Sequence, residues 1–235
     1  MAQHIGIVGV SAEGAALCYR TICLEGERYL GAYDHPEVSM HTHSLGEYMK
    51  WIELDDWNGV GDLMLSSAEK LARAGARFLI CPDNTVHQAF AYVEAHSPLP
   101  WLHIADVVGD EATARSFRRL GLTGTKWLVD SDVYPRRLTT RGVECMRPTP
   151  IERDEINRII FDELAYGVTS ASAVVSFQRT IGRMKDDGCD AVVLGCTEIP
   201  LLMSDANSPL PTLDSTRLLA RAALRRAVID ESSGV

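Results

Sequence analysis

The chain has 235 residues, of which 46% are hydrophobic and 23% charged, a composition typical of a soluble globular protein with one large or two small domains. Its formal net charge of −9 at pH 7 argues against a non-specific nucleic-acid binder, which needs a basic face. No segment approaches the roughly 18 apolar residues of a membrane span. The N-terminal stretch MAQHIGIVGV lacks the basic start and the long apolar run of a signal peptide. We therefore expect a cytoplasmic protein that binds neither nucleic acid nor membranes.

Short apolar runs alternate with longer helical patterns along the chain. The apolar runs predict strands at residues 5–10, 38–42, 78–81, 101–104, 124–129, 143–146 and 191–194. The longer patterns predict helices at residues 15–30, 58–74, 85–96, 110–120, 152–166, 172–187 and 213–228. Such alternation is typical of parallel sheets covered by helices on both faces, so we expect an α/β fold.

Two segments of the chain follow the same plan. GARFLICPD begins at Gly75 and GCDAVVLGC at Gly188, and in each a predicted helix ends at the glycine and an apolar strand follows. A polar residue comes eight positions after each glycine, Asp83 in the first segment and Cys196 in the second, 113 positions apart. A period of nearly half the chain fits the duplication of an α/β unit.

The duplication predicts two pseudo-symmetric, Rossmann-like half-domains with parallel sheets. We expect residues 1–100 and 208–235 to form the first and residues 101–207 the second. Binding groups gather beyond the carboxyl ends of parallel strands, and pockets are common at domain interfaces. The active site is therefore expected in the cleft between the half-domains, with Asp83 and Cys196 on opposite walls. The alternative is that Asp83 only caps a helix and Cys196 only packs in the core.

The stretches GARFLICPDNTVH and DAVVLGCTEIPLL together resemble the aspartate/glutamate racemase family, which carries a CNTAH-like motif in its first half and LGCTE in its second. GIVGVSAEG, IIFDELAYG and LPTLDST are similar in kind to other stretches of that family. The resemblance covers nearly the whole chain. It implies a two-domain fold, usually a homodimer, that inverts an amino-acid Cα without pyridoxal phosphate, metal or any other cofactor.

One position departs from the family pattern. Matching DNTVH to CNTAH puts Asp83 where family members often have the first catalytic cysteine. Cys81, two residues earlier, is a rival candidate, although the register between the two halves favours Asp83. Inversion needs one group to remove a proton from Cα and another to deliver one to the opposite face. A thiol has an ordinary pKa of about 8.5 and suits either task, whereas a carboxylate becomes a capable base where burial raises its pKa.

The substrate carboxylate and the developing carbanion need fixed hydrogen-bond donors. The candidate substrate-binding residues are Ser11, Asn84, Thr85, Thr125 and Thr197. Relatives tend to place a lysine near the segment that here reads ELAYG, which has none, so Lys50 or Lys126 would have to replace it and the substrate stays open. His87 is interpreted equally well as a structural group or as a ligand contact.

Other signals are weaker. The six cysteines form no CxxC pair, which argues against a zinc ribbon or a thioredoxin site. His41 and His43 are interpreted as part of a polar loop rather than a metal site, and GIVGVSAEG is not a dinucleotide motif. Two alternatives to a racemase remain: a relative with one working thiol that decarboxylates or isomerises small dicarboxylates, and a non-catalytic homologue that binds a small molecule.

Overall fold

The structure is a computed structural model that describes residues 2–229. The chain forms two compact units, one made of Met1–Ile104 with Thr216–Val235 and the other of Ala105–Ser215. Each unit contains one four-stranded sheet in which all strands are parallel. The predicted α/β fold with two parallel sheets is therefore confirmed.

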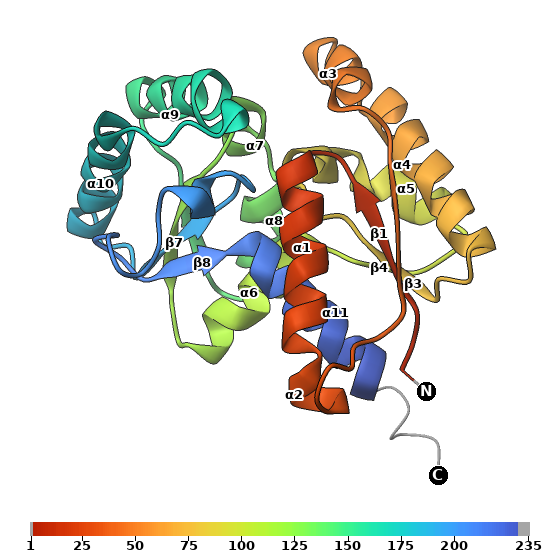
Figure 1. Ribbon diagram of the computed structural model, residues 1–235. Coiled ribbons are helices and arrows are strands. Elements are labelled where there is room, and N and C mark those ends of the chain that lie inside the picture. The colour runs from red at the N-terminus through yellow and green to blue at the C-terminus, as the bar shows by residue number, and fades with distance from the viewer. Residues whose placement is uncertain (1, 230–235) are drawn as a thin grey trace. The chain divides into compact units, whose positions relative to one another are not determined.

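The first unit has the strand order β2-β1-β3-β4. Its strands are β1 Ile5–Gly9, β2 Val38–Thr42, β3 Phe78–Ile80 and β4 Trp101–Leu102. Its helices are α1 Ala12–Glu25, α2 Glu27–Leu30, α3 Leu45–Glu53, α4 Trp57–Arg73, the 3₁₀ helix η1 Thr85–Ala89, α5 Phe90–His96 and α11 Ser215–Ile229. Figure 1 shows α1 and α11 on one face of this sheet and α4 and α5 on the other, so β1 and β3 are buried from both sides.

The second unit has the corresponding strand order β6-β5-β7-β8. Its strands are β5 Arg119–Thr123, β6 Glu144–Met146, β7 Ala191–Leu194 and β8 Thr212–Asp214. Its helices are α6 Ile104–Ala114, α7 Lys126–Asp130, α8 Val133–Thr139, α9 Pro150–Asp162, η2 Leu164–Tyr166, α10 Ala171–Asp186 and η3 Ile199–Leu201. Figure 1 shows α9 and α10 together against β7, where Ile159, Phe177 and Ile181 form one buried cluster with Val192.

The duplication inferred from the sequence extends to individual backbone hydrogen bonds. Gly75 and Gly188 both adopt positive φ, 99° and 90°, a conformation that glycine accepts without a steric penalty. In each unit the N–H of the glycine and the N–H of the next residue donate to carbonyl oxygens of the preceding helix. The residue after the glycine donates from Ala76 to Leu71 at 3.0 Å in the first unit and from Cys189 to Met184 at 2.9 Å in the second. This hydrogen-bond pattern ends α4 and α10 in the same way, so β3 and β7 begin from equivalent backbone geometry.

Several predicted boundaries differ from the structure. The strand expected at residues 124–129 lies at Arg119–Thr123 instead, and Lys126–Asp130 is helix α7, because Thr125 caps a helix there. The helix expected at residues 110–120 begins at Ile104 and ends at Ala114. Helix α3 was not expected. β8 precedes α11, in a region where helix alone was predicted.

The two units and the predicted half-domains divide the chain at different residues. β4 pairs with β3 through Leu79↔Trp101, which holds residues 101–104 in the first unit. β8 pairs with β7 through Val192↔Thr212, which holds residues 208–215 in the second. Each boundary therefore follows the last strand of a sheet.

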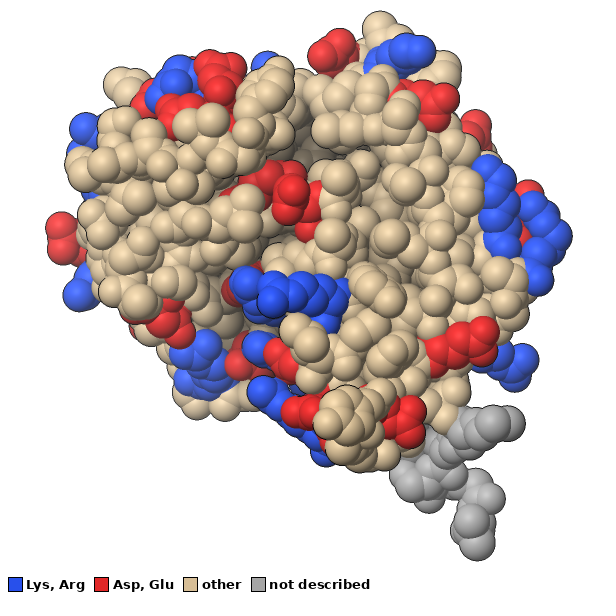
Figure 2. All heavy atoms as spheres, in the orientation of Figure 1, with Lys and Arg blue, Asp and Glu red and all other residues tan. Residues whose placement is uncertain are grey.

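The surface carries both signs of charge. Figure 2 shows basic and acidic side chains interspersed over the face that it draws. Many form ion pairs within one unit, such as Arg183 with Glu152 at 2.7 Å and Arg221 with Glu25 at 2.8 Å. Within residues 2–229, every helix falls short of the length and apolar character that crossing a membrane requires.

Candidate active site

The loop after β3 carries three of the predicted site residues. Asp83 lies three residues after the end of β3, and its Oδ1 accepts a hydrogen bond of 3.2 Å from the N–H of Val86 in the first turn of η1. Asn84 and Thr85, the next two residues, are only 2% and 8% exposed. Asp83 lies one position before Asn84, the N-cap residue of η1, and its hydrogen bond to the first turn fixes the carboxylate beyond the carboxyl end of β3.

The His87 side chain links the backbone of this loop to the backbone of Ile104. Its Nε2 accepts from the N–H of Ile104 (3.3 Å), so its Nδ1 carries the proton that is donated to the carbonyl oxygen of Asp83 (2.6 Å). The ring is therefore neutral in one tautomer, and it is 3% exposed and stacked on Phe90. These contacts identify His87 as a structural support of the Asp83 loop.

Cys81 and Tyr48 lie in the core beside Asp83. Cys81 is fully buried, and burial, followed by the charge of Asp83, raises the pKa of its thiol well above the ordinary value. Tyr48, on the unexpected helix α3, is also fully buried, and burial raises the pKa of its hydroxyl, with smaller contributions from Cys81 and Asp83. Both groups therefore stay protonated near neutral pH.

The loop after β7 carries Cys196 and Thr197. Gly195 precedes them and donates a hydrogen bond of 2.9 Å to the carbonyl oxygen of Thr123 on β5. A Cβ at this glycine would lie 2.5 Å from that same oxygen, so the close approach of β5 requires glycine. Cys196 packs against the buried cluster of the second unit, and its sulfur donates to Oε2 of Glu198 at 2.9 Å. The Thr197 hydroxyl donates to the same oxygen at 2.7 Å.

Ser11 and Thr125 occupy equivalent places in the two units. Ser11 follows β1 and caps α1, with its Oγ accepting from the N–H of Gly14 at 3.2 Å. Thr125 follows β5 and caps α7, with its Oγ1 accepting from the N–H of Leu128 at 3.2 Å. Each cap thus lies at the carboxyl end of the strand next to the one that carries Asp83 or Cys196.

The structure groups the candidate residues by unit. Ser11, Asp83, Asn84 and Thr85 lie at the carboxyl ends of β1 and β3 in the first unit, and Thr125, Cys196 and Thr197 lie at those of β5 and β7 in the second. Their roles in catalysis and binding stay predictions. Sequence reasoning missed Glu198, although it belongs to the quoted LGCTE motif, and it missed Tyr48 because helix α3 was not recognised.

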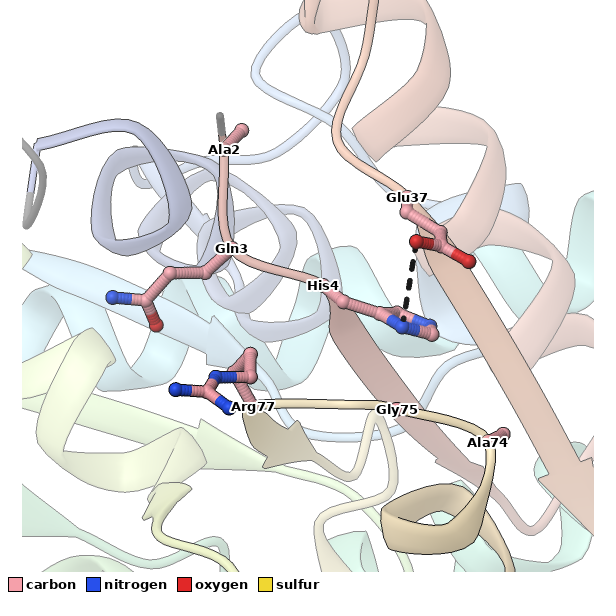
Figure 3. A pocket seen from close by; sticks show the side chains of 7 residues that line it. All are labelled: Ala2, Gln3, His4, Glu37, Ala74, Gly75 and Arg77. Atoms are coloured by element: carbon pink, nitrogen blue, oxygen red, sulfur yellow. Dashed lines mark ion pairs between the residues drawn. The ribbon is translucent and has the colours of Figure 1, made fainter.

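A hollow of about 650 Å³ lies at the opposite end of the first sheet. Figure 3 shows it before the starts of β1, β2 and β3, where His4, Glu37 and Arg77 line it and His4 pairs with Glu37 at 3.7 Å. None of the predicted site residues contributes to its lining. Since ligands of open parallel sheets bind beyond the carboxyl ends of the strands, this hollow is not the candidate site.

The histidine-rich stretch has local hydrogen-bond partners. His41 Nδ1 lies 3.0 Å from Ser67 Oγ, and Lys70 Nζ donates to His41 Nε2 at 3.1 Å. His43 Nε2 lies 3.2 Å from Ser66 Oγ. These contacts tie the edge strand β2 to α4, and His41 lies in that strand and not in the polar loop that was expected.

Known proteins share both the sequence and the fold. The sequence matches the Asp/Glu/hydantoin racemase family over residues 7–223. The crystal structure of a putative Asp/Glu racemase from Yersinia pestis is similar with a TM-score of 0.88 and 30% identity, over 96% of this chain and 99% of that one. An aspartate racemase homologue from Pyrococcus horikoshii is similar with a TM-score of 0.83 and 28% identity, over 97% and 99% of the two chains.

A curated relative adds a sequence comparison. The broad specificity amino-acid racemase RacX of Bacillus subtilis is 22% identical over 164 residues, which cover 68% of this chain and 69% of that protein. The family match spans both units and includes the two loops after β3 and β7. This chain belongs to the Asp/Glu/hydantoin racemase family of isomerases.

Proposed function

We propose that this protein interconverts the enantiomers of an amino acid without a cofactor, and that Asp83 and Cys196 act on opposite faces of the same Cα. The observation that carries the proposal is the equivalence of these residues. They follow β3 and β7, which hold the same place in two sheets of the same strand order. Inversion needs one acid–base group on each face of Cα, and a duplicated unit supplies one such group from each copy.

The proton balance gives each residue two roles. In one direction the Asp83 carboxylate removes the Cα proton and the Cys196 thiol donates its own proton to the other face. In the reverse direction a Cys196 thiolate removes the proton and protonated Asp83 donates. The two directions start from different protonation states, so we expect the two enantiomers to give different pH profiles.

Asp83 suits the first role better than its rival Cys81. The Cys81 sulfur is fully buried and its raised pKa keeps it as an inert thiol. The carboxylate of Asp83 stands at the end of the strand, in the loop that His87 and the Val86 N–H fix. A buried thiol in the core is a packing group, whereas a fixed carboxylate at a strand end is placed to meet a ligand.

The substrate carboxylate would be held by the polar groups of both loops. Asn84, Thr85 and Thr197 supply an amide, hydroxyls and backbone N–H groups, and Ser11 and Thr125 stand at the ends of the neighbouring strands. Such fixed donors stabilise charge that develops at the carboxylate when the Cα proton leaves. We propose aspartate, glutamate or a similar amino acid as the substrate, since named relatives include a putative Asp/Glu racemase and a broad specificity amino-acid racemase.

We further propose a cytoplasmic homodimer, as the family resemblance implies. Large hydrophobic side chains are exposed on α1 and α2, where Leu24 is 61% and Tyr29 41% exposed, and such exposure favours a contact surface. Sedimentation velocity at micromolar concentration would decide the point, and a single species of about 26 kDa would contradict the dimer.

The function is tested by hydrogen exchange at Cα. The protein is incubated in deuterium oxide with a panel of L- and D-amino acids, and deuterium at Cα and the enantiomeric ratio are measured by mass spectrometry and chiral chromatography. We expect exchange with inversion for at least one acidic amino acid, and loss of more than about 100-fold in Asp83→Ala and in Cys196→Ala. Cys81→Ala serves as the control in the neighbouring core position and should retain exchange wherever it folds.

Three other outcomes contradict the proposal. Loss in Cys196→Ala with full activity in Asp83→Ala would favour the one-thiol alternative, which the aspartate at position 83 keeps open. Release of carbon dioxide or a changed carbon skeleton would identify a decarboxylase or a different isomerase. Absence of exchange and of product with every amino acid and dicarboxylate tested would favour a binding protein.

A further inference from the structure

Glu198 is a buried carboxylate that directly contacts the candidate catalytic sulfur. It is 8% exposed, and its Oε2 accepts from the Cys196 thiol at 2.9 Å and from the Thr197 hydroxyl at 2.7 Å. A carboxyl oxygen has two lone pairs, and both hydrogen bonds go to this one oxygen. None of the roles derived above for the site requires this residue.

The backbone around Glu198 is held firmly. Gly195 is pressed against the carbonyl of Thr123, and the N–H of Ile199 donates to the carbonyl of Cys196 at 3.1 Å. Glu198 itself stands immediately before the 3₁₀ helix η3. The sulfur and the carboxylate are therefore two residues apart on a rigid turn, and their contact does not depend on a flexible side chain reaching across the protein.

The chemical effect of the contact follows from charge. A carboxylate beside a thiol disfavours loss of the thiol proton, because the thiolate would place a second negative charge next to the first. The accepted hydrogen bond also directs the S–H bond along one line. Glu198 is the charged group of this loop that contacts the sulfur.

Building on the function proposed above, we propose that Glu198 is the positioning residue of Cys196: it orients the thiol and keeps its proton on the sulfur, so that Cys196 enters the reaction as the proton donor. Asp83 then starts as the base. The resting enzyme is thus set for one direction of inversion, and the reverse direction must first remove the thiol proton. This asymmetry belongs to a chain that pairs a carboxylate with a thiol in place of two thiols.

The test measures the thiol without relying on turnover. Alkylation of Cys196 by iodoacetamide is followed as a function of pH, with peptide mass spectrometry to separate it from the other five cysteines. In Glu198→Gln we expect the midpoint of the pH profile to fall by about one unit or more, because the neighbouring negative charge is gone. Glu198→Asp restores the charge and should bring the midpoint back toward that of the wild type.

The matched control is Glu144→Gln, the same chemical change in the same unit. Glu144 begins β6 and lies at the amino end of the sheet, where it pairs with Arg119 at 3.2 Å. Its replacement should leave the Cys196 midpoint unchanged. An unchanged midpoint in Glu198→Gln, or an equal shift in Glu144→Gln, overturns the inference. If Glu198→Gln fails to fold, the wild type still decides, because a midpoint below about 8.5, the ordinary value for a thiol, also overturns it.

Exchange kinetics separate this inference from the proposed function. In Glu198→Gln the direction in which Cys196 donates should lose activity at a lower pH than in the wild type, whereas a merely structural role would lower both directions at every pH. A shifted alkylation midpoint in a protein that exchanges no amino acid would reject the proposed function and support the positioning of the thiol. Normal Cα exchange together with an unshifted alkylation profile in Glu198→Gln would support the proposed function and reject the positioning role of Glu198.

Discussion

Replacement of Gly195 by alanine tests the packing that presents Cys196. A Cβ at this position would lie 2.5 Å from the carbonyl oxygen of Thr123 and 2.7 Å from Cδ2 of Leu128. The first contact is with backbone that also receives the Gly195 hydrogen bond, so no rotamer change relieves it. Forcing extra atoms into a closely packed site costs about 1–3 kcal/mol, and we expect a loss of this size in the free energy of unfolding.

Gly182 provides the matched control in the same unit. It lies within α10, and a Cβ there would meet nothing within 4 Å. Glycine inside a helix is less stable than alanine by about 0.5–1 kcal/mol, so Gly182→Ala should stabilise the protein. The same substitution is therefore expected to have opposite signs at two positions, with a total difference of about 1.5–4 kcal/mol.

Urea unfolding followed by circular dichroism measures both variants. Alkylation of Cys196 by iodoacetamide gives a second readout, because relief of the clash must displace the residue that follows Gly195. We expect Gly195→Ala to change the alkylation rate severalfold and Gly182→Ala to leave it unaltered. Equal stability of the two variants would refute the close approach of β5 and β7 from which the prediction is worked.

Two further predictions concern the first unit. A hydrogen bond from Arg221 lowers the pKa of Glu25, so the folded state binds fewer protons in acid than the unfolded state does. The ion pair therefore stabilises the fold above the ordinary pKa of 4.5, and this stabilisation is lost as pH falls through the lowered pKa of the folded state. Glu25→Gln should cost about 1 kcal/mol at pH 7 and flatten the pH dependence of thermal unfolding below that value, and an unchanged dependence would contradict it. His87→Ala removes two hydrogen bonds to buried backbone and should cost about 2–3 kcal/mol in urea unfolding, whereas a cost under about 0.5 kcal/mol would show that the ring does not support the Asp83 loop.

The sequence predicted the parts of the fold in which local pattern and tertiary structure agree. Residues 38–42 and 191–194 form strands with the expected bounds, and the two glycine-ended helices before β3 and β7 follow the inferred duplication. Their signals are local: a continuous apolar run, or a glycine where a helix must end.

The remaining elements depend on contacts that no local pattern reveals. The segment RLGLTGTKWLVD has a short apolar stretch on each side of its Thr and Gly residues, so periodicity alone does not separate strand β5 from helix α7, and the Thr125 cap decides the boundary. β8 is a three-residue strand that exists because it pairs with β7. Helix α3 has nine residues and buries Tyr48 and Ile52, so its apolar pattern spans little more than one turn.

The equivalence of the two strand ends was predictable because a repeated unit places corresponding residues at corresponding positions. Asp83 and Cys196 were found by register, and the structure gives them equivalent strand ends. Their chemical surroundings were not predictable, because they come from side chains outside the repeat. Asp83 is held by the Val86 N–H and supported by His87, whereas Cys196 is held by the carboxylate of Glu198.

That difference bears directly on mechanism. A duplicated scaffold tends toward two equal acid–base groups, which would treat both faces of a Cα alike. Here one copy presents the Asp83 carboxylate on a loop whose backbone carbonyl is bonded by His87, and the other presents a thiol that donates to the carboxylate of Glu198. The histidine supports the backbone of the Asp83 loop and does not contact the carboxylate, whereas Glu198 contacts the Cys196 sulfur itself. Equal backbone geometry therefore supports an unequal pair of side chains, and under the function proposed above their neighbours would set the preferred direction of inversion.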